Sequence, residues 1–470
     1  MTGMDVDLRT LSGTGPIHFV GVGGAGMCAL AELVLRAGGR VSGCDLKEGR
    51  ALDDLRALGA EIQVGHDADH VEEASVLVVS SAVPAAHPEV LAAHERGIPV
   101  LKRAQALGAW VNQGKLVAIA GTHGKTTTTA MATEMMAAAG LHPTALVGGR
   151  VEAWGGNLRF GSEDLFVVEA DEYDRSFQTL TPDIAVITNM EADHLDIYGD
   201  LEGVRAGFLT FLRGVRGGGP VIVCADDYGA ASLLASTGSA GLSYGLSAGS
   251  MLRGVDVRPR GRGISCVVMD EGRRAGELHL SVGGVHNLRN ALGAAAAARA
   301  AGAPWKGILE GARAFHGVSR RFQTLGEAHG VTVMDDYAHH PSEIRATLEA
   351  ARMAFPGRRV VAVFQPHLYS RTRDFAAEFG KALALADVVW VTDIFPAREA
   401  PIPGVTAALV SGAAEAAGAR QVHYHPELES LAAALSEVLR EEDVLFTLGA
   451  GSVEEIGPAV LAELEERVHA

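Results

Sequence analysis

The order of apolar segments along the chain constrains its fold more than any other feature. Short runs rich in Val and Ile alternate with longer Ala- and Leu-rich segments, and the alternation repeats in three blocks. A strand followed by a helix and another strand usually forms a parallel unit. We therefore predict an α/β protein of three domains, at residues 1–112, 113–322 and 323–470.

The outer blocks show this alternation throughout. In the first block, strands are predicted at 17–22, 40–45, 75–81 and 98–101, with a helix from Cys28 to Ala37. In the third block, strands are predicted at 331–336, 359–364 and 388–392, with helices at 341–354 and 372–385, and two more strand–helix pairs after them.

The middle block combines parallel and antiparallel patterns. Its strands are predicted at 115–120, 164–170, 183–189 and 220–226, with a helix from about Lys125 to Ala139. Alternating polar and apolar residues at about 250–285 predict antiparallel strands, and an Ala-rich helix follows near 287–301.

Charge and composition exclude several classes of protein. The 470 residues include 40 Lys and Arg against 57 Asp and Glu, a net charge of −17 that disfavours nucleic acid and anionic membranes as partners. The 58 glycines show no period, which argues against a collagen-like chain. No stretch reaches the ~18 apolar residues of a membrane span, and the first residues lack the pattern of a leader peptide. We therefore expect a cytoplasmic protein.

The cysteines do not indicate a disulfide framework or a structural metal site. Cys28, Cys44, Cys224 and Cys266 form no C-x-x-C pair and have no histidine at a zinc-ligand spacing. They are expected to be reduced, buried thiols.

The segment AGTHGKTTTT, at 120–129, lies between a predicted strand and a predicted helix. Gly121 and Gly124 allow backbone N–H groups to turn toward a phosphate, Lys125 adds a cation, and the Thr126 hydroxyl can bind Mg²⁺. One glycine of the strict Walker A pattern is missing, so this is a shortened phosphate loop. The alternative is a glycine-rich turn that only caps the helix.

A second glycine-rich segment, GVGGAGM at 21–27, follows a strand and opens a helix. Asp45 ends the next strand, where a dinucleotide site places an acid for a ribose. By itself this motif leaves three ligand states open: NAD(P), another nucleotide diphosphate, or close strand–helix packing with no ligand.

Acidic residues and a histidine follow two other strands of the middle block. VVEADEYD, at 167–174, and TNMEADHLD, at 188–196, place them at the edge where open α/β sheets bind ligands. Glu169 is a natural Mg²⁺ ligand beside Thr126. His194 is a less usual Mg²⁺ ligand, and a structural histidine is the alternative.

Later segments add further polar candidates. Asn287 and Asn290 share one helix face and suit either an adenine edge or a helix cap. Arg320 and Arg321 suit a phosphate, a carboxylate or a solvated surface.

The third block contributes another group of polar residues. Asp336, His339, His367 and Arg371 follow strands and are predicted to share one sheet edge. Packing alone does not explain such a density of polar groups.

Taken together and in this order, the motifs resemble the Mur ligase family, and the resemblance spans nearly the whole chain. The segments that carry it are HFVGVGGAGM, VSGCD, VVSSAVP, GTHGKTTT, VVEADE, TPDIAVITNMEADHLD, HNLRNALGA, RRFQ, DDYAHHPSEI, FQPHLYSRTRD and LGAGS. The resemblance implies a Rossmann-like N-terminal domain for a UDP-sugar, a central P-loop ATPase domain with extra antiparallel strands, and a Rossmann-like C-terminal domain for an amino acid.

Within the family, the motifs are most similar to the branch that joins L-alanine to UDP-N-acetylmuramate in peptidoglycan synthesis. The resemblance implies that ATP phosphorylates the muramoyl carboxylate and that the amine of L-alanine then displaces phosphate. ATP and Mg²⁺ are the implied cofactors, and UDP-N-acetylmuramate and L-alanine the implied substrates. A monomer or homodimer is expected.

The resemblance also implies residue roles, motif by motif. Catalysis is assigned to Lys125, Glu169, His194, His339 and Arg371, with Arg371 as a carboxylate clamp, and the metal to Thr126, Glu169 and His194. ATP is assigned to Gly121, Thr122, His123, Gly124, Lys125, Thr126, Thr127, Asn290, Arg321 and Asp336, the last near the ribose. The UDP-sugar is assigned to Gly23, Gly24, Ala25, Gly26, Met27, Asp45, Ser80 and Ser81. The amino acid is assigned to Tyr337, His339, His367 and Arg371.

Two departures from the family pattern bear on these roles. Other branches carry a carbamylated lysine that bridges Mg²⁺, but no lysine occurs between Lys125 and Lys306. This favours the alanine-adding branch. Leu368 stands where some relatives have Arg, so one contact to alanine is not carried over.

Three rival functions remain at this stage. The nearest is a recycling ligase that adds a whole tripeptide to the same nucleotide sugar. An NAD-dependent dehydrogenase would leave the phosphate loop unexplained. A nucleotide-sugar binding protein without turnover would not need the acidic strand ends and the third-block residues together.

Overall fold

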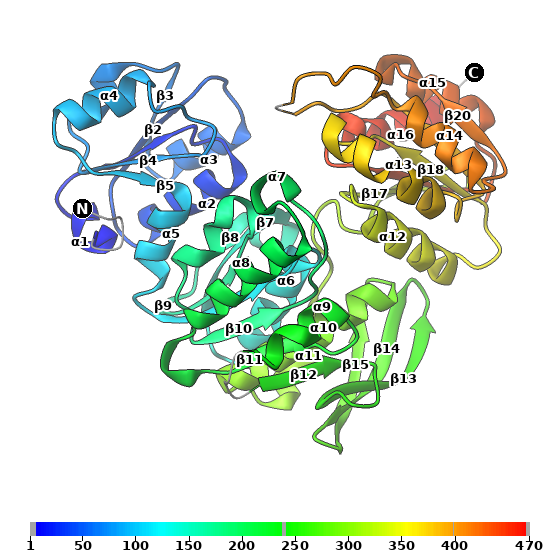
Figure 1. The fold of residues 1–470 in the computed structure, drawn as a ribbon, viewed down its shortest axis with the longest axis horizontal. Helices are drawn as coiled ribbons and strands as arrows, with labels where there is room; N and C mark the ends of the chain where they lie inside the picture. The colour runs from blue at the N-terminus through cyan, green and yellow to red at the C-terminus, as the bar shows by residue number, and fades with distance from the viewer. Residues whose placement is uncertain (1–5, 237–240, 398, 467–470) are drawn as a thin grey trace. The chain divides into compact units, whose positions relative to one another are not determined.

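The strands of the computed structural model form three sheets (Figure 1). The structure describes residues 6–236, 241–397 and 399–466, so the predicted absence of a leader falls partly outside the described residues. The chain divides into two compact units. The first contains the described residues up to Asp256 with Cys266–Leu278 and Arg289–Phe315, and the second contains Val257–Ser265, His279–Leu288 and the described residues from His316 onward.

The first sheet has five strands in the order β3-β2-β1-β4-β5, and all its pairs are parallel. Its strands are β1 (Ile17–Val20), β2 (Val41–Asp45), β3 (Glu61–Val64), β4 (Val76–Val79) and β5 (Val100–Lys102). Its helices are α1 (Leu8–Ser12), α2 (Ala25–Arg36), α3 (Arg50–Ala57), η1 (Ala68–Val71), α4 (Pro88–Glu95) and α5 (Arg103–Val111). The strand order changes direction between β1 and β4, and ligands of such sheets bind at this point.

The central sheet has ten strands in the order β15-β14-β13-β12-β11-β10-β6-β9-β7-β8. β6 (Lys115–Ala120) lies between β9 (Ser162–Glu169) and β10 (Ile184–Ile187) and is parallel to both. The remaining strands are β7 (Pro143–Val151), β8 (Gly156–Arg159), β11 (Val221–Cys224), β12 (Gly241–Gly245), β13 (Leu252–Arg260), β14 (Gly263–Asp270) and β15 (Arg273–Leu280). Two-residue turns join β13, β14 and β15 as hairpins, so the predicted antiparallel strands are confirmed.

Helices accompany the central sheet between its strands. They are α6 (Lys125–Ala138), η2 (Glu152–Trp154), η3 (Tyr173–Thr179), α7 (Leu195–Tyr198), α8 (Leu201–Arg213), η4 (Arg216–Gly218), α9 (Tyr228–Leu234), α10 (Val285–Ala301) and α11 (Trp305–Ala314). Gly307 and Gly311 of α11 lie so close to α6 that an added Cβ would meet the α6 backbone at 2.5 Å. These glycines allow the helix that opens at the phosphate loop to be packed at close range.

The third sheet has the order β16-β17-β21-β18-β19-β20, in which only β16 pairs antiparallel. Its strands are β16 (Gln323–Ala328), β17 (Val331–Asp336), β18 (Val360–Phe364), β19 (Val388–Val391), β20 (Val422–Tyr424) and β21 (Val444–Leu448). Its helices are α12 (Pro341–Ala354), α13 (Tyr369–Leu383), α14 (Ala408–Ala416), α15 (Leu428–Val438), η5 (Ser452–Glu455) and α16 (Ile456–Glu466). The α/β class with Rossmann-like outer parts is thus confirmed.

One hydrophobic core joins the first and central sheets. It runs from Leu8 and Phe19 through Trp110 to Phe166 and Phe177, all fully buried or nearly so. Burial of each such side chain contributes roughly 1.5–3 kcal/mol. The two glycine-rich loops of the first unit are therefore held on one continuous packed body.

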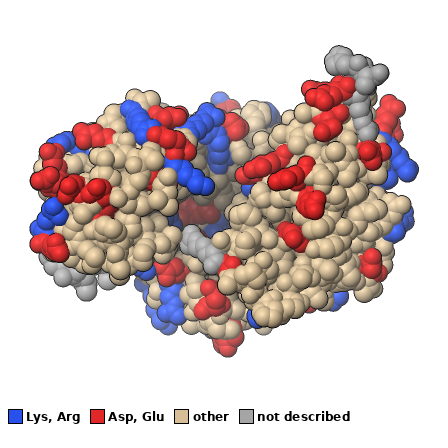
Figure 2. Space-filling model, turned by 90° about the horizontal axis from the view of Figure 1, so that it is seen from above, with Lys and Arg blue, Asp and Glu red and all other residues tan. Residues whose placement is uncertain are grey.

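The surface carries charges of both signs. On the face drawn in Figure 2, acidic and basic residues are interspersed among uncharged ones. Among the described residues, no helix is both long and apolar enough to cross a membrane.

Candidate active site

The phosphate loop connects β6 to α6, and its two glycines adopt conformations that other residues rarely adopt. Gly121 has φ 139° and Gly124, the N-cap of α6, has φ 80°. A Cβ on Gly121 would overlap Thr188 Oγ1, and one on Gly124 would lie 2.5 Å from Asn290 Oδ1. The structure thus places Asn290 beside the phosphate loop, as an ATP-binding role requires.

Side chains after β10 hold this loop in shape. Asn189 accepts the His123 N–H at 2.7 Å through Oδ1 and donates to the His123 carbonyl at 3.0 Å, while the Thr188 hydroxyl donates to that carbonyl at 2.6 Å. The Thr122 hydroxyl accepts the Glu191 N–H at 2.9 Å. Of the TNMEADHLD segment, only His194 was predicted as a site residue.

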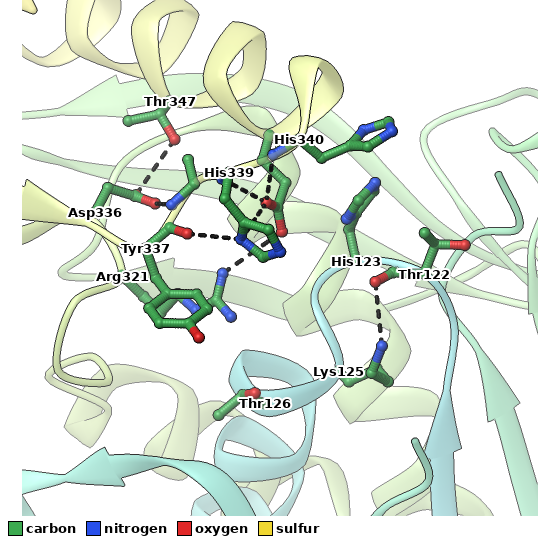
Figure 3. Close-up of polar contacts among 12 residues, drawn as sticks. Thr122, His123, Lys125, Thr126, Arg321, Asp336, Tyr337, His339, His340 and Thr347 are labelled. Atoms are coloured by element: carbon green, nitrogen blue, oxygen red, sulfur yellow. Dashed lines mark hydrogen bonds and ion pairs between the residues drawn. The ribbon is translucent and has the colours of Figure 1, made fainter. Parts of the chain in front are cut away.

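Lys125 is the charged centre of the loop. Its ammonium donates to the carbonyl oxygens of Gly121 at 2.7 Å and Thr122 at 3.1 Å, the latter drawn in Figure 3. It also pairs with Glu172 Oε2 at 2.8 Å. Burial opposes the charge, but Glu172, Asp171 and Glu169 outweigh it and hold the Lys125 pKa above its usual value. Lys125 therefore carries its positive charge at neutral pH.

Glu172 is a site residue that the sequence analysis missed. Burial raises the pKa of this carboxyl to about 7, although the Lys125 ammonium acts against the rise. Its Oε1 is buried and has no hydrogen-bond partner among the described residues. The residue lies in the quoted VVEADEYD segment, but only the fold shows that it faces Lys125.

Two of the three predicted metal ligands are in direct contact. The Thr126 hydroxyl, in the first turn of α6, donates to Glu169 Oε2 at 2.9 Å, and Gly148 N–H of β7 donates to the same oxygen at 2.7 Å. His194 caps α7 with φ 53°, and its Nε2 lies 4.0 Å from Glu172 Oε1. The hydroxyl, the carboxylate and the unsatisfied Glu172 oxygen are hard oxygen donors of the kind that Mg²⁺ prefers, so these residues fit a magnesium ion.

The other glycine-rich loop turns from β1 into α2. Gly24 is the N-cap of α2, and Ala25 is its first residue. Asp45 Oδ2 accepts the Gly23 N–H at 2.9 Å, and Oδ1 accepts the Leu46 N–H at 2.8 Å. Asp45 thus orders the loop that it was predicted to serve, and its ribose contact stays a prediction.

The remaining residues predicted to bind the UDP-sugar differ in exposure. Met27 is 2 % exposed, and its side chain belongs to the core. Ser80 and Ser81 follow β4, the neighbour of β1, and Ser81 is exposed.

A cavity of about 210 Å³ extends from this loop to the predicted metal ligands. Gly26 and Arg103 line one end, and Glu169 and Asp171 line the other. A Cβ on Gly26 would lie 2.9 Å from Arg103 Nη1, so the glycine makes room for this guanidinium. The cavity thus lies between the loop after β1 and the carboxylates at the end of β9, inside one packed unit.

In the second unit, Asp336 ends β17 and is 5 % exposed. It accepts the N–H groups of Phe322 and Ala338, both at 2.9 Å, and the Thr347 hydroxyl at 3.3 Å (Figure 3). Burial raises its pKa to about 6 against the Arg321 charge. In this structure Asp336 holds the loop after β17, and its contact with an ATP ribose stays a prediction.

His339 lies between Tyr337 and Glu343. Its Nδ1 is 2.9 Å from the Tyr337 carbonyl (Figure 3), an acceptor, so Nδ1 carries the proton. Burial first, and then the nearby Arg371, lower the pKa of His339 to about 3. The ring is therefore neutral at pH 7, with Nε2 as a hydrogen-bond acceptor.

The other predicted amino-acid residues lie around this ring. His367 contacts His339 edge to face at 5.7 Å, and Arg371 Nη1 is 3.5 Å from His367 Nδ1. The structure thus brings Tyr337, His339, His367 and Arg371 together. Leu368 adopts φ 68° at the start of α13 and donates its N–H to the Phe395 carbonyl at 3.0 Å.

Three further candidates have identifiable local roles. Arg321 lies with its guanidinium 5.1 Å from the centre of the Tyr337 ring and 3.6 Å from Glu343. Arg320 is tied to Asp335 at 2.9 Å and to the Gly449 carbonyl at 2.7 Å, so it is a structural residue. Asn287 lies in the first turn of α10, is buried and donates to the Gly283 carbonyl at 2.8 Å, which is a structural role rather than a contact to adenine.

Family descriptions match the chain in three consecutive parts. "Mur ligase family, catalytic domain" matches residues 16–115, "Mur ligase middle domain" matches 119–298, and "Mur ligase, glutamate ligase domain" matches 320–451. Together they cover most of the chain and all three sheets.

Individual proteins show the same likeness. A UDP-N-acetylmuramate–L-alanine ligase of Geobacter sp. (strain M21) is 45 % identical over 449 residues, which are 96 % of this chain and 97 % of that protein. The structure of a UDP-N-acetylmuramate–alanine ligase from Thermotoga maritima matches with a TM-score of 0.80 at 29 % identity and covers 96 % of this chain and 100 % of the other. A ligase from Neisseria meningitides whose name specifies a tripeptide, L-alanyl-γ-D-glutamyl-meso-diaminopimelate, matches with a TM-score of 0.60 at 31 % identity, over 65 % of this chain and 100 % of the other. The chain therefore belongs to the Mur ligase family.

Proposed function

We propose that this chain joins L-alanine to the carboxylate of UDP-N-acetylmuramate, using ATP, and that the reaction passes through an acyl phosphate. The products are UDP-N-acetylmuramoyl-L-alanine, ADP and phosphate, and the amide enters peptidoglycan precursor synthesis. The observation that carries the proposal is the near full-length likeness to relatives named for alanine addition. The two glycine-rich loops, and the cavity from Gly26 to Glu169, support it.

Phosphate transfer is assigned to the first unit. The backbone N–H groups around Gly124 and the Lys125 ammonium offset the charge of the ATP phosphates, and Asn290 contacts the nucleotide. Thr126, Glu169 and His194 would hold Mg²⁺, which supplies further positive charge when it is bound. In this transfer a carboxylate must approach a phosphate chain, and both are anions. The cations reduce the repulsion between them.

The cavity suits the sugar part of the substrate. With the diphosphate at the start of α2, near Gly24 and Gly26, the rest of the molecule extends toward Glu169. Arg103 faces the cavity beside Gly26 and offers a guanidinium to the anionic groups of the substrate. This contact was not among the sequence predictions.

The amino acid is assigned to the second unit. Arg371, which is 7 % exposed, would clamp the carboxylate of L-alanine, with Tyr337 and His367 beside it. A histidine with a pKa of about 3 is a weak base, so we assign His339 a hydrogen-bonding role rather than removal of the amine proton.

The test is release of phosphate from ATP and Mg²⁺ by the full chain, with UDP-N-acetylmuramate and L-alanine omitted in turn. We expect turnover only when both are present. Turnover with NADH oxidation instead, or none with any amine, would contradict the proposal.

A second candidate is the addition of a whole tripeptide to the same nucleotide sugar, which the partial match to the Neisseria ligase favours. The same assay decides it with the tripeptide L-alanyl-γ-D-glutamyl-meso-diaminopimelate as the amine. Turnover with the tripeptide and none with L-alanine would assign the chain to this second function.

Domain limits and cellular setting are part of the proposal. We propose domains at 1–112, 113–322 and 323–470 that bind the UDP-sugar, ATP and amino acid respectively. The protein is proposed to work in the cytoplasm as a monomer or homodimer, without nucleic acid or membrane partners.

A further inference from the structure

Six side chains of the first sheet's domain, one of them a central carboxylate, lie close together, and the proposed reaction uses none of them. They come from five places in the chain, of which only those of His66 and His70 are close in sequence. They are His18 on β1, Cys44 on β2, His66 after β3, His70 in η1, and His87 and Glu89 at the start of α4. We call this group the His/Cys cluster.

Glu89 is the centre of the His/Cys cluster and is fully buried. Its Oε2 lies 3.0 Å from His18 Nε2, and its Oε1 lies 3.1 Å from Cys44 Sγ. The same Oε1 is 3.3 Å from His66 Nδ1 and 3.4 Å from His70 Nδ1. One carboxylate thus has three imidazoles and a thiol around it.

The surroundings of the cluster are apolar. Cys44 belongs to a buried group with Val20, Val71, Leu77 and Val90, which excludes water from that side. A buried charge is stable only when an opposite charge compensates it. A carboxylate in such a place is stable with a cationic partner, which is either a protonated imidazole of the cluster or a bound metal ion.

His87 adds an unsatisfied atom. Its Nδ1 is buried and has no hydrogen-bond partner among the described residues, while its ring meets His66 edge to face at 4.5 Å. Buried ring nitrogens are normally paired. His87 therefore adds, next to His66, a ring nitrogen that the described protein atoms leave unsatisfied, although it is not one of the ligands proposed below.

We propose that His18, Cys44, His70 and Glu89 bind a zinc-type divalent ion. One ligand atom from each residue lies within 4.8 Å of the others. Tetrahedral zinc, with bonds of about 2.0–2.3 Å, holds its ligand atoms roughly 3.3–3.8 Å apart, so small shifts complete the site. Imidazole, thiolate and carboxylate are the donors that zinc accepts together.

The charges balance in such a site. Ion binding releases the Cys44 proton to solvent, which leaves one thiolate, one carboxylate and two neutral imidazoles. Two negative charges equal the charge of the ion, so the buried site becomes neutral. The Ser42 hydroxyl lies 2.8 Å from His18 Nδ1 and orients the ring with Nε2 toward the cluster.

The proposed metal site is accessible from solvent, and an ion bound there would affect the loop that starts at Gly21. The side chains of His66 and His70 are 20 % and 11 % exposed, so an ion enters past them. The Cys44 carbonyl accepts the N–H groups of Gly21 at 2.9 Å and Val22 at 3.1 Å. Zinc on Cys44 would therefore brace the glycine-rich loop that starts at Gly21.

The experiment uses the full chain without a histidine tag, stripped with a chelator and titrated with Co²⁺. We expect one equivalent to produce a sulfur-to-cobalt charge-transfer band with tetrahedral visible bands, and Zn²⁺ to displace it. The predicted Mg²⁺ ligands include no sulfur, so Co²⁺ bound there gives no such band. Zn²⁺ should also raise the melting temperature of the stripped protein.

Variants separate the site from a general effect on folding. Cys44→Ser should abolish the charge-transfer band and the zinc-dependent rise in melting temperature, and Glu89→Gln should weaken binding at least tenfold. Cys28→Ser, on α2 of the same domain, and His94→Gln, at an exposed position on α4, are the matched controls and should keep both signals.

Two results would overturn the proposal. A charge-transfer band that persists in Cys44→Ser would place the ion elsewhere. The second result is that the parent chain and the controls show no band and that Zn²⁺ leaves their melting temperature unchanged. The cluster would then be a hydrogen-bonded part of the core without a metal ion.

Discussion

At the level of single residues, the Lys125–Glu172 pair offers the most direct test of phosphate transfer. Lys125→Ala removes the buried ammonium that lies 2.8 Å from Glu172 Oε2. We expect phosphate release to fall by at least ~100-fold, because the positive charge facing the phosphates is lost. UDP-N-acetylmuramate binding, measured by calorimetry, should remain, since its proposed contacts lie on the other glycine-rich loop.

The control for this substitution is Lys115→Ala. Lys115 opens the same strand β6 but is exposed, and its ammonium donates to the Ala301 carbonyl at 3.3 Å. It should keep full turnover. Equal losses in both variants, or loss of UDP-sugar binding in Lys125→Ala, would contradict the division of sites.

Asp336 gives a pH-dependent prediction. Burial raises its pKa from 3.8 to about 6, so the folded state holds the proton more tightly than the unfolded state. This stabilisation is fully present below about pH 4 and is lost as the pH rises through about 6. Relative to Asp336→Asn, the parent chain should lose on the order of 3 kcal/mol of unfolding free energy across that range. Urea unfolding of both chains at several pH values measures it, and parallel curves would refute the assignment.

Sequence reasoning reached many of the site residues because they lie inside short motifs. Lys125 and Thr126 follow from the phosphate-loop pattern, and Glu169 follows from the end of an apolar strand. Glu172 was missed, since nothing in the local pattern shows that it turns toward Lys125. Asp45 was identified, but its bond to Gly23 N–H depends on how β2 pairs with β1.

At the level of elements, the start of α6 carries a prediction about backbone conformation. Gly124 and Gly140, at the two ends of α6, have nearly equal φ of 80° and 82°. An added Cβ meets Asn290 at 2.5 Å in the first case and nothing within 4 Å in the second. Gly140→Ala should therefore lose only about 1 kcal/mol of stability and keep its kcat/KM.

Gly124→Ala should behave differently. It carries the same backbone strain and also displaces Asn290 or the loop, so we expect phosphate release to fall at least ~10-fold. Denaturant unfolding and the phosphate assay, run on both variants, compare the two effects. Equal activity in the two alanine variants would show that Asn290 and the loop shape are unimportant.

Elements with a continuous apolar run were predictable, and those without one were not. The run at 115–120 became β6 with the same limits, and 341–354 became α12, where Pro341 starts the helix. β7 and β8 were missed because glycines interrupt their apolar residues, and β3 was missed because its residues are largely exposed. The His/Cys cluster escaped the spacing rule for zinc sites because its ligands come from separate elements.

At the level of the whole molecule, the two units offer separate reporters of unfolding. Of the four tryptophans, Trp390 is in the second unit and Trp110 is in the core of the first. A chain whose single tryptophan is Trp110 should report unfolding of the first unit by fluorescence, and a chain whose single tryptophan is Trp390 should report unfolding of the second. UDP-N-acetylmuramate should raise the denaturant midpoint seen by Trp110 and leave that of Trp390 unchanged.

The comparison needs one control and has one contrary outcome. Each single-tryptophan chain must keep the phosphate-release activity of the parent. Equal ligand-induced shifts of the denaturant midpoint at Trp110 and Trp390 would mean that the two units unfold in one cooperative transition.

The cavity that runs from Gly26 to Glu169 would let the first unit select substrates by their length. Because the residues that line it belong to one compact unit, the distance between the loop after β1 and Glu169 is set by the protein rather than by the ligand. A nucleotide sugar without the acidic side arm would fill the first loop and still fall short of Lys125. The protein would then discriminate between nucleotide sugars with and without the acidic side arm by their length. It would need no contact that recognises the arm itself.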